Sequence, residues 1–164
     1  MLKYKNAVVT FAEVPEEVTL CINITGCPVH CEGCHSPELW EDTGHTLDGR
    51  AIDTLISNNQ GISCVCFMGG DSEPEIIPLL AEVVKKKGLK VGWYSGQEHF
   101  PNVDLSSIDF LKVGPYIKEK GGLDNPNTNQ RLYSKIQVVE ETSGKIINYW
   151  TDITDEFYAD KEQT

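Results

Sequence analysis

Positive charge is scarce in this chain. Of its 164 residues, 14 are Lys or Arg and 25 are Asp or Glu, which gives a formal net charge of -11 at pH 7. Phosphate backbones and anionic membrane surfaces attract basic proteins and repel a protein of this charge. We therefore expect neither nucleic acid nor membrane among its partners.

Long apolar runs are also missing. No segment reaches the roughly 18 consecutive apolar residues of a membrane span, and residues 1–6 lack the apolar stretch of a secretory signal. These absences predict a cytoplasmic protein. A closed eight-stranded β/α barrel takes about 250 residues. We therefore expect a single domain over residues 1–164, with an acidic tail from about residue 152.

The six cysteines are unevenly spaced. Cys27, Cys31 and Cys34 lie within eight residues, whereas Cys64 and Cys66 are two apart in an apolar run and Cys21 stands alone. An exported disulfide scaffold normally spreads its cysteines along a shorter chain. The clustering instead predicts reduced thiols and one metal site, with Cys21, Cys64 and Cys66 as small buried core residues.

Apolar periodicity predicts alternating strands and helices. Helical spacing marks residues 51–57, and Ser72 with Glu75 forms a capping-box pattern that predicts a second helix start. Apolar and β-branched runs predict strands over residues 18–25, 62–68, 89–94, 109–113, 134–139 and 145–149. Such alternation is typical of right-handed β-α-β units, so we expect an α/β fold with a mainly parallel sheet, an incomplete β/α barrel.

Glycine-containing turns follow four of the predicted strands. They cover residues 26–34, 69–71, 95–96 and 114–116. Because the carboxyl ends of parallel strands meet at one edge of a sheet, we expect these turns to lie together and to form the active site.

The cysteine triplet has the spacing Cys-x3-Cys-x2-Cys from Cys27 to Cys34 on a predicted loop. Three soft thiolates suit an iron–sulfur cluster or zinc. A 4Fe-4S cluster usually takes four cysteines, so three would leave one iron open to an exogenous ligand. The alternative is a structural zinc with His30 or His35 as the fourth ligand, although zinc sites usually pair their ligands in two separated knuckles.

Further motifs accompany the triplet. Gly33 precedes its last cysteine, and Trp40 follows six residues after it. Further short motifs lie at residues 67–71, 93–96, 109–117 and 129–131. In these segments, which span most of the chain, the sequence resembles the radical S-adenosylmethionine family. Within that family it is similar to the glycyl-radical activases of anaerobic ribonucleotide reductase.

The resemblance implies a set of site residues. Cys27, Cys31 and Cys34 would each bind one iron of a 4Fe-4S cluster, and S-adenosylmethionine would chelate the fourth iron. Gly69 and Gly70 lack a Cβ, which would let their backbone approach the methionine part of that cofactor. The residues implied to contact the cofactor are Gly33, Cys34, His35, Gly69, Gly70 and Asp71.

The resemblance also implies an activity. The chain would be an oxidoreductase that cleaves S-adenosylmethionine reductively and abstracts the Cα hydrogen of a glycyl residue in anaerobic ribonucleoside-triphosphate reductase. A low-potential donor such as flavodoxin would supply the electron. The alternatives are another small radical enzyme acting on a free metabolite, such as a deazaguanine synthase, and a non-enzymatic zinc-binding module.

Overall fold

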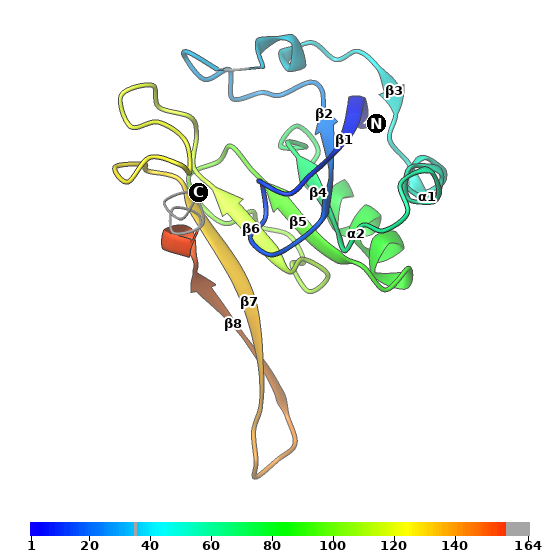
Figure 1. The fold of residues 1–164 in the computed structure, drawn as a ribbon, viewed down its shortest axis with the longest axis vertical. Helices are drawn as coiled ribbons and strands as arrows, with labels where there is room; N and C mark the ends of the chain where they lie inside the picture. Colours follow the sequence, from blue (N-terminus) through cyan, green and yellow to red (C-terminus); the bar gives the residue numbers. More distant parts are fainter. Residues whose placement is uncertain (35, 157–164) are drawn as a thin grey trace.

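The fold is built on one eight-stranded sheet with the strand order β3-β1-β2-β4-β5-β6-β7-β8. A computed structural model describes residues 1–34 and 36–156, and Figure 1 shows how the elements are arranged. The strands are β1 (Lys3–Thr10), β2 (Thr19–Ile24), β3 (His45–Thr46), β4 (Cys64–Met68), β5 (Lys90–Tyr94), β6 (Phe110–Val113), β7 (Arg131–Val139) and β8 (Ile146–Asp152). The helices are the 3-10 turn η1 (Pro37–Trp40), α1 (Gly49–Asn58) and α2 (Ile76–Lys86).

The centre of the sheet is parallel and its two sides are antiparallel. β2 pairs with β4, β4 with β5, and β5 with β6 in parallel. β1 pairs antiparallel with β2 and β3, and β7 pairs antiparallel with β6 and β8. The expectation of a mainly parallel sheet in an incomplete β/α barrel is therefore wrong, because this is a mixed sheet with few helices.

The connections between the strands explain why the sheet contains both parallel and antiparallel pairs. α1 lies between β2 and β4, and α2 lies between β4 and β5, so that these strands run parallel. β7 and β8 are joined by a short turn in which the Glu140 N–H donates to the Lys145 carbonyl at 2.9 Å. A turn this short can join only antiparallel strands.

Within the described ranges, no helix is long and apolar enough to cross a membrane.

The two faces of the sheet bury different side chains because successive strand residues point to opposite sides. One face packs against α1 and α2 in the larger apolar core, where Phe67 and Trp93 are fully buried. The opposite face carries Cys21, Cys64 and Cys66 in a smaller core. The prediction that these three cysteines are buried core residues is confirmed.

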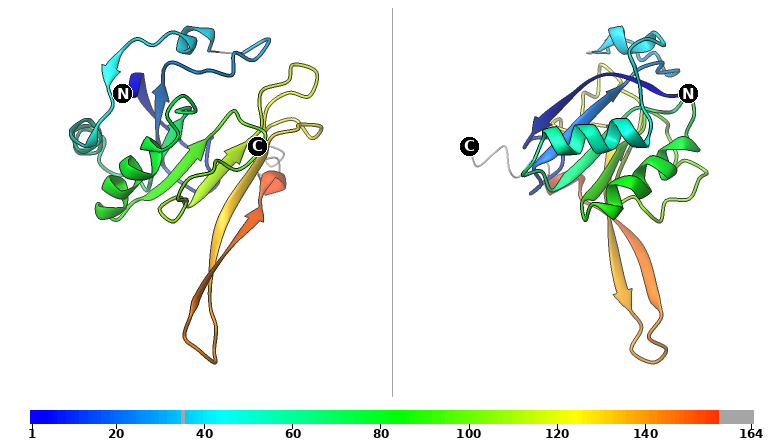
Figure 2. Two further views of the ribbon diagram at one scale, coloured as in Figure 1. Left: turned by 180° about the vertical axis from the view of Figure 1, so that it is seen from behind. Right: turned by 90° about the vertical axis from the view of Figure 1, so that its right-hand side faces the viewer.

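The β7–β8 hairpin extends well beyond the rest of the molecule (Figures 1 and 2). Leu132 at its base is fully buried, whereas Val139 and Ile146 near its tip are 60% and 58% exposed. The outer part of the hairpin therefore depends on cross-strand pairing and adds little to the core.

The helices α1 and α2 begin differently. The side chain of Asp48 caps α1 by accepting a hydrogen bond from the Ala51 N–H at 2.9 Å. α2 begins at Ile76, and no side chain caps it. The predicted capping by Ser72 is wrong because residues 71–75 form turns before the helix starts.

Gly70 has a structural reason to be glycine. Its φ is +94°, which L side chains rarely adopt, and a Cβ at this position would come within 2.7 Å of the Ile77 Cδ1 atom in α2. Gly69 also has a positive φ, of +108°. The sharp exit from β4 into the turn before α2 thus depends on two successive glycines.

We expect Gly70→Ala to lower the free energy of unfolding by about 2–4 kcal/mol, from backbone strain and from the clash with Ile77. Gly61→Ala is the matched control, because Gly61 has a φ of +90° and nothing within 4 Å of its would-be Cβ. The Gly61→Ala substitution should lower the free energy of unfolding by the backbone strain alone, about 1–2 kcal/mol. Urea unfolding of the three proteins measures both values, and equal losses would show that α2 accommodates the methyl group without cost.

Candidate functional site

A cavity of about 220 Å³ lies at the carboxyl ends of the parallel strands. Among the strand residues that line it, four from neighbouring strands form its floor: Asn23 of β2, Met68 of β4, Tyr94 of β5 and Lys112 of β6. These four residues are in register across the sheet. The parallel pairing therefore sets the floor of the cavity directly.

The wall of the cavity comes from the segments that follow these strands. Cys27, Cys34, Gly69 and Asp71 all line it. The structure thus brings together residues from the cysteine triplet and from the Gly-Gly-Asp segment, which lie more than thirty residues apart in the sequence. This juxtaposition is what the carboxyl-edge argument predicted.

Other predicted site residues lie elsewhere. Cys31 is half-buried and does not belong to this wall, and Gly33 is exposed on the same loop. Gly70 is buried against the core side chain of Ile77. His35 lies outside the described residues.

The cysteine loop is held to the segment that follows it. The Gly26 N–H donates to the Glu41 carbonyl and the Cys27 N–H to the Leu39 carbonyl, each at 3.1 Å. These two bonds fix the start of the loop above β2. The first thiol of the triplet therefore has a defined position.

Two contacts shape the rest of the loop. The imidazole of His30 stacks on the Trp40 indole with ring centroids 4.6 Å apart. The Cys34 Sγ accepts a hydrogen bond from the Ser36 N–H at 3.4 Å. Such N–H···S bonds stabilise a thiolate and influence the potential of a cluster that it holds.

Asp71 connects two of the turns. Its carboxylate accepts hydrogen bonds from the Ser95 hydroxyl at 2.6 Å and from the Gly96 N–H at 2.8 Å. The predicted role in cofactor contact therefore competes with a structural one, since two of its acceptor positions are already used. A carboxylate has about four such positions, so Asp71 retains further capacity.

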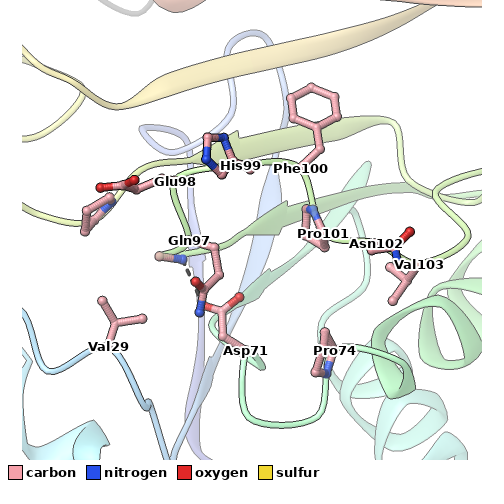
Figure 3. Close-up of a pocket in the computed structure, with 12 residues that line it drawn as sticks. Val29, Asp71, Pro74, Gln97, Glu98, His99, Phe100, Pro101, Asn102 and Val103 are labelled. Atoms are coloured by element: carbon pink, nitrogen blue, oxygen red, sulfur yellow. Dashed lines mark hydrogen bonds between the residues drawn. The ribbon is translucent and has the colours of Figure 1, made fainter.

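Asp71 and Gly96 also line a second cavity, of about 620 Å³. Figure 3 shows this cavity with Val29, Asp71 and Pro74 along one side and His99 and Phe100 along the other. Because both cavities share two lining residues, they adjoin at the ends of β4 and β5.

The carbonyl groups of the two glycines already accept hydrogen bonds. The Trp93 indole N–H donates to the Gly69 carbonyl at 2.8 Å, and the Glu73 N–H donates to the Gly70 carbonyl at 3.2 Å. Each carbonyl oxygen has a second lone pair. Of the two residues, only Gly69 lines the cavity, so it is the better placed for a ligand.

Lys112 is a site residue that sequence reasoning missed. Its ammonium group donates to the Gly114 carbonyl at 3.0 Å and to the Ser95 carbonyl at 3.3 Å. Burial lowers the pKa of Lys112 to about 8, and the charge of Asp71 opposes this shift. The signal in the sequence was a lysine inside the otherwise apolar strand 110–113.

The donor set fits an iron–sulfur cluster. Three soft thiolates occupy one loop, and two of them border the cavity. In residues 1–34 and 36–156, no three Cys, His, Asp or Glu side chains are gathered around a point that could hold one metal ion. In a cluster each thiolate binds a different iron, so its ligands need not converge as closely as those of a single ion.

The other three cysteines are in a different environment. Burial raises the pKa of Cys64 to about 12 and that of Cys66 well above its ordinary value. Cys21 is paired in register with Cys66 on the neighbouring strand and is only 5% exposed. Thiols that are buried and protonated are poor nucleophiles and poor metal ligands.

This contrast predicts two classes of thiol. When the metal-free protein is treated with iodoacetamide at pH 8 under argon, Cys27, Cys31 and Cys34 should be alkylated first. Cys64 should react only on unfolding, because burial raises the pKa of its thiol to about 12, far above that pH, and its side chain is fully buried. Peptide mass spectrometry over time checks this, and early labelling of Cys64 or Cys66 would contradict the described core.

Comparison with known proteins identifies the family. No curated protein and no solved structure matches the chain. A family model described as the 4Fe-4S single cluster domain matches residues 16–140. The match includes the cysteine loop, Asp71 and Lys112, and it covers well over half of the chain. The chain therefore belongs to the 4Fe-4S single cluster domain family.

Proposed function

We propose that this chain is a radical S-adenosylmethionine enzyme that activates an anaerobic ribonucleoside-triphosphate reductase by generating a glycyl radical in it. The observation that carries the proposal is the shared cavity, in which Cys27 and Cys34 face the same space as Gly69 and Asp71. Membership of a 4Fe-4S family supports an iron–sulfur cluster over the zinc alternative.

The chain's own residues have distinct parts in this proposal. Cys27, Cys31 and Cys34 hold the cluster and leave one iron without a protein ligand. A reduced 4Fe-4S cluster supplies one electron for cleavage of the sulfonium carbon–sulfur bond of S-adenosylmethionine. The carbonyl of Gly69 and the carboxylate of Asp71 are acceptors for the ammonium group of that ligand.

The adjoining cavity supports the proposal by its size and position. Its volume of about 620 Å³ lies in the range of small-molecule sites. It borders the cluster side of the molecule through Asp71 and Gly96. We assign it to the nucleoside part of the ligand.

Two segments singled out by their resemblance to activases lie against each other. The side-chain amide of Asn129 donates to the Pro115 carbonyl at 3.1 Å, and that of Gln130 donates to the Gly114 carbonyl at 3.4 Å. Pro115 also lines the larger cavity. This supports a role for the two segments as one unit beside the ligand, where a partner protein can complete the enclosure and exclude water.

Metal analysis tests the cluster assignment. After anaerobic reconstitution, we expect about four irons per chain and a brown chromophore, and any one of Cys27→Ala, Cys31→Ala and Cys34→Ala should abolish stable cluster binding. Cys64→Ala is the matched control, because it removes a fully buried thiol away from the loop and should leave the iron content unchanged. Full iron retention in all three loop variants would overturn the assignment.

Electron paramagnetic resonance tests the reaction. The reconstituted protein is mixed anaerobically with dithionite, S-adenosylmethionine and the anaerobic reductase, and we expect a glycine-centred doublet in the reductase together with release of methionine. The Cys31→Ala variant is the negative control. Cleavage of S-adenosylmethionine without a protein radical would instead favour the free-metabolite enzyme, and absence of any cleavage would contradict both readings.

A further inference from the structure

The outer part of the β7–β8 hairpin is a two-stranded ribbon with one apolar side. Its strands pair Ile136 with Tyr149 and Val138 with Ile147. Residues that pair directly across antiparallel strands, and residues two apart along a strand, point to the same side. These four side chains therefore form one surface, which we call the ribbon face. Ile136 and Val138 are each 45% exposed, Tyr149 is 53% exposed, and Ile147 is half-buried.

The opposite side of the ribbon is interrupted by polar groups. Across it, Gln137 pairs with Asn148, and this pair of amides separates Val139 near the tip from aromatic side chains near the base. There the ring of Phe100 lies edge-on to that of Trp150, with centroids 5.7 Å apart. Of the two sides, the ribbon face is thus the one with an uninterrupted apolar surface.

A two-stranded ribbon with an open apolar side is a weak structure by itself. Hairpins of two strands are at best marginally stable in water, and they gain stability when an apolar face packs against another element. This hairpin projects well beyond the rest of the molecule (Figures 1 and 2), and the ribbon face stays open to solvent in the part of the chain that the structure describes. A packing partner for it must come from elsewhere.

The charge of the hairpin indicates which partner fits. Residues 131–152 contain three basic and three acidic residues, so the hairpin is neutral, and the whole excess of acidic residues lies in the rest of the chain. Two copies of so acidic a molecule repel each other. The neutral hairpin is the region where two copies can meet without this repulsion, and its projection keeps the acidic bodies apart (Figure 2).

The charges within the hairpin are also unevenly placed. Arg131 and Lys135 lie in the half of β7 next to the body, whereas Glu140 and Glu141 belong to the turn at the tip. One residue of opposite sign near each pair leaves a positive surplus at the base and a negative surplus at the tip. When two such ribbons stack antiparallel about a two-fold axis, each tip lies over the base of the other, and opposite surpluses face each other.

We propose that two copies of this chain associate through the ribbon face, with their hairpins stacked antiparallel about a two-fold axis. The interface is isologous, so the same four side chains of each copy pack against those of the other. Four half-exposed side chains supply less than the roughly 800 Å² per partner of a standard interface, so the dimer is weak and depends on concentration. This association is independent of the reaction that the chain catalyses.

Sedimentation equilibrium of the full chain measures the association, with the cluster reconstituted and under argon, over a concentration series that reaches the millimolar range. We expect a monomer–dimer equilibrium. Val138→Glu should weaken it about tenfold or more, because the dimer would then bury a carboxylate without a partner. Iron content and circular dichroism of each variant report whether the cluster and the hairpin are intact.

Val139→Glu is the matched control. Val139 follows Val138 on β7, is 60% exposed and points to the opposite side of the ribbon. Its substitution adds the same charge at nearly the same place, but the carboxylate stays in water. We therefore expect association to weaken less than about threefold.

Photocrosslinking locates the contact without a disruptive substitution. We place p-benzoylphenylalanine at Tyr149, which keeps an aromatic ring on the ribbon face, and mix isotope-labelled and unlabelled chains in equal amounts. Irradiation should join labelled to unlabelled peptides, and mass spectrometry should place the attachment within residues 131–152 of the second copy. Attachment mainly outside these residues would overturn the proposed arrangement.

The sedimentation outcomes are equally decisive. A chain that stays monomeric up to millimolar concentration would overturn the proposal, and so would equal weakening by Val138→Glu and Val139→Glu. If the chain is monomeric and Val138→Glu instead weakens its binding to the anaerobic reductase, the ribbon face belongs to that partner and self-association is wrong. A dimer that Val138→Glu disrupts and Val139→Glu leaves intact supports the ribbon face as the contact between copies.

Discussion

The register of four parallel strands is the constraint on which the rest of the molecule depends. It aligns Ile22, Phe67, Trp93 and Leu111 in one layer of the helix-covered core. One position further along, on the opposite face, the same pairing aligns the cavity floor that ends at Lys112. Since a slip of one residue would exchange the two faces, a single pairing pattern fixes both the core and the site.

The site combines features that stabilise the fold with features that do not. The Asp71 carboxylate holds two turns together, and the paired glycines shape the exit from β4. The buried indole N–H of Trp40 has no hydrogen-bond partner among the described residues and gives the fold no comparable benefit, whereas the ammonium of Lys112 is part-buried and donates to two backbone carbonyls. A buried polar group without a partner within the protein is typical of a binding site, where a ligand supplies the missing partner.

The apolar patterns of the sequence predicted most central elements, because fully buried strands such as β4 have continuous apolar runs. They could not predict the direction of pairing. β1 is half-exposed along its length, and its sequence gave no strand signal. The exposed part of β7 has the same β-branched pattern as a buried strand, so its exposure could not be predicted. Ser72 failed as a cap because the Gly70 turn delays the start of α2 to Ile76.

The site was predicted where short motifs carry it and missed where the tertiary structure creates it. Cys27, Cys34, Gly69 and Asp71 were found from spacing and from their place after strands. Lys112 lines this cavity because β6 pairs with β5. Trp40 lines it from the end of η1, which follows the cysteine loop. The local signal for Lys112 was its place inside an apolar strand, and this signal does not indicate which cavity the side chain borders.

The hydrogen bond from Trp93 to Gly69 links two regions that the sheet otherwise keeps apart. Trp93 is fully buried among the helix-facing side chains, yet its indole N–H orients a backbone carbonyl at the rim of the cavity. Tight interior packing transmits small displacements instead of absorbing them. The position of the Gly69 carbonyl at the cavity therefore depends in part on packing in the hydrophobic interior. Substitutions far from a ligand, in α2 or behind β5, can consequently change the affinity of the cavity for that ligand while every wall residue stays the same.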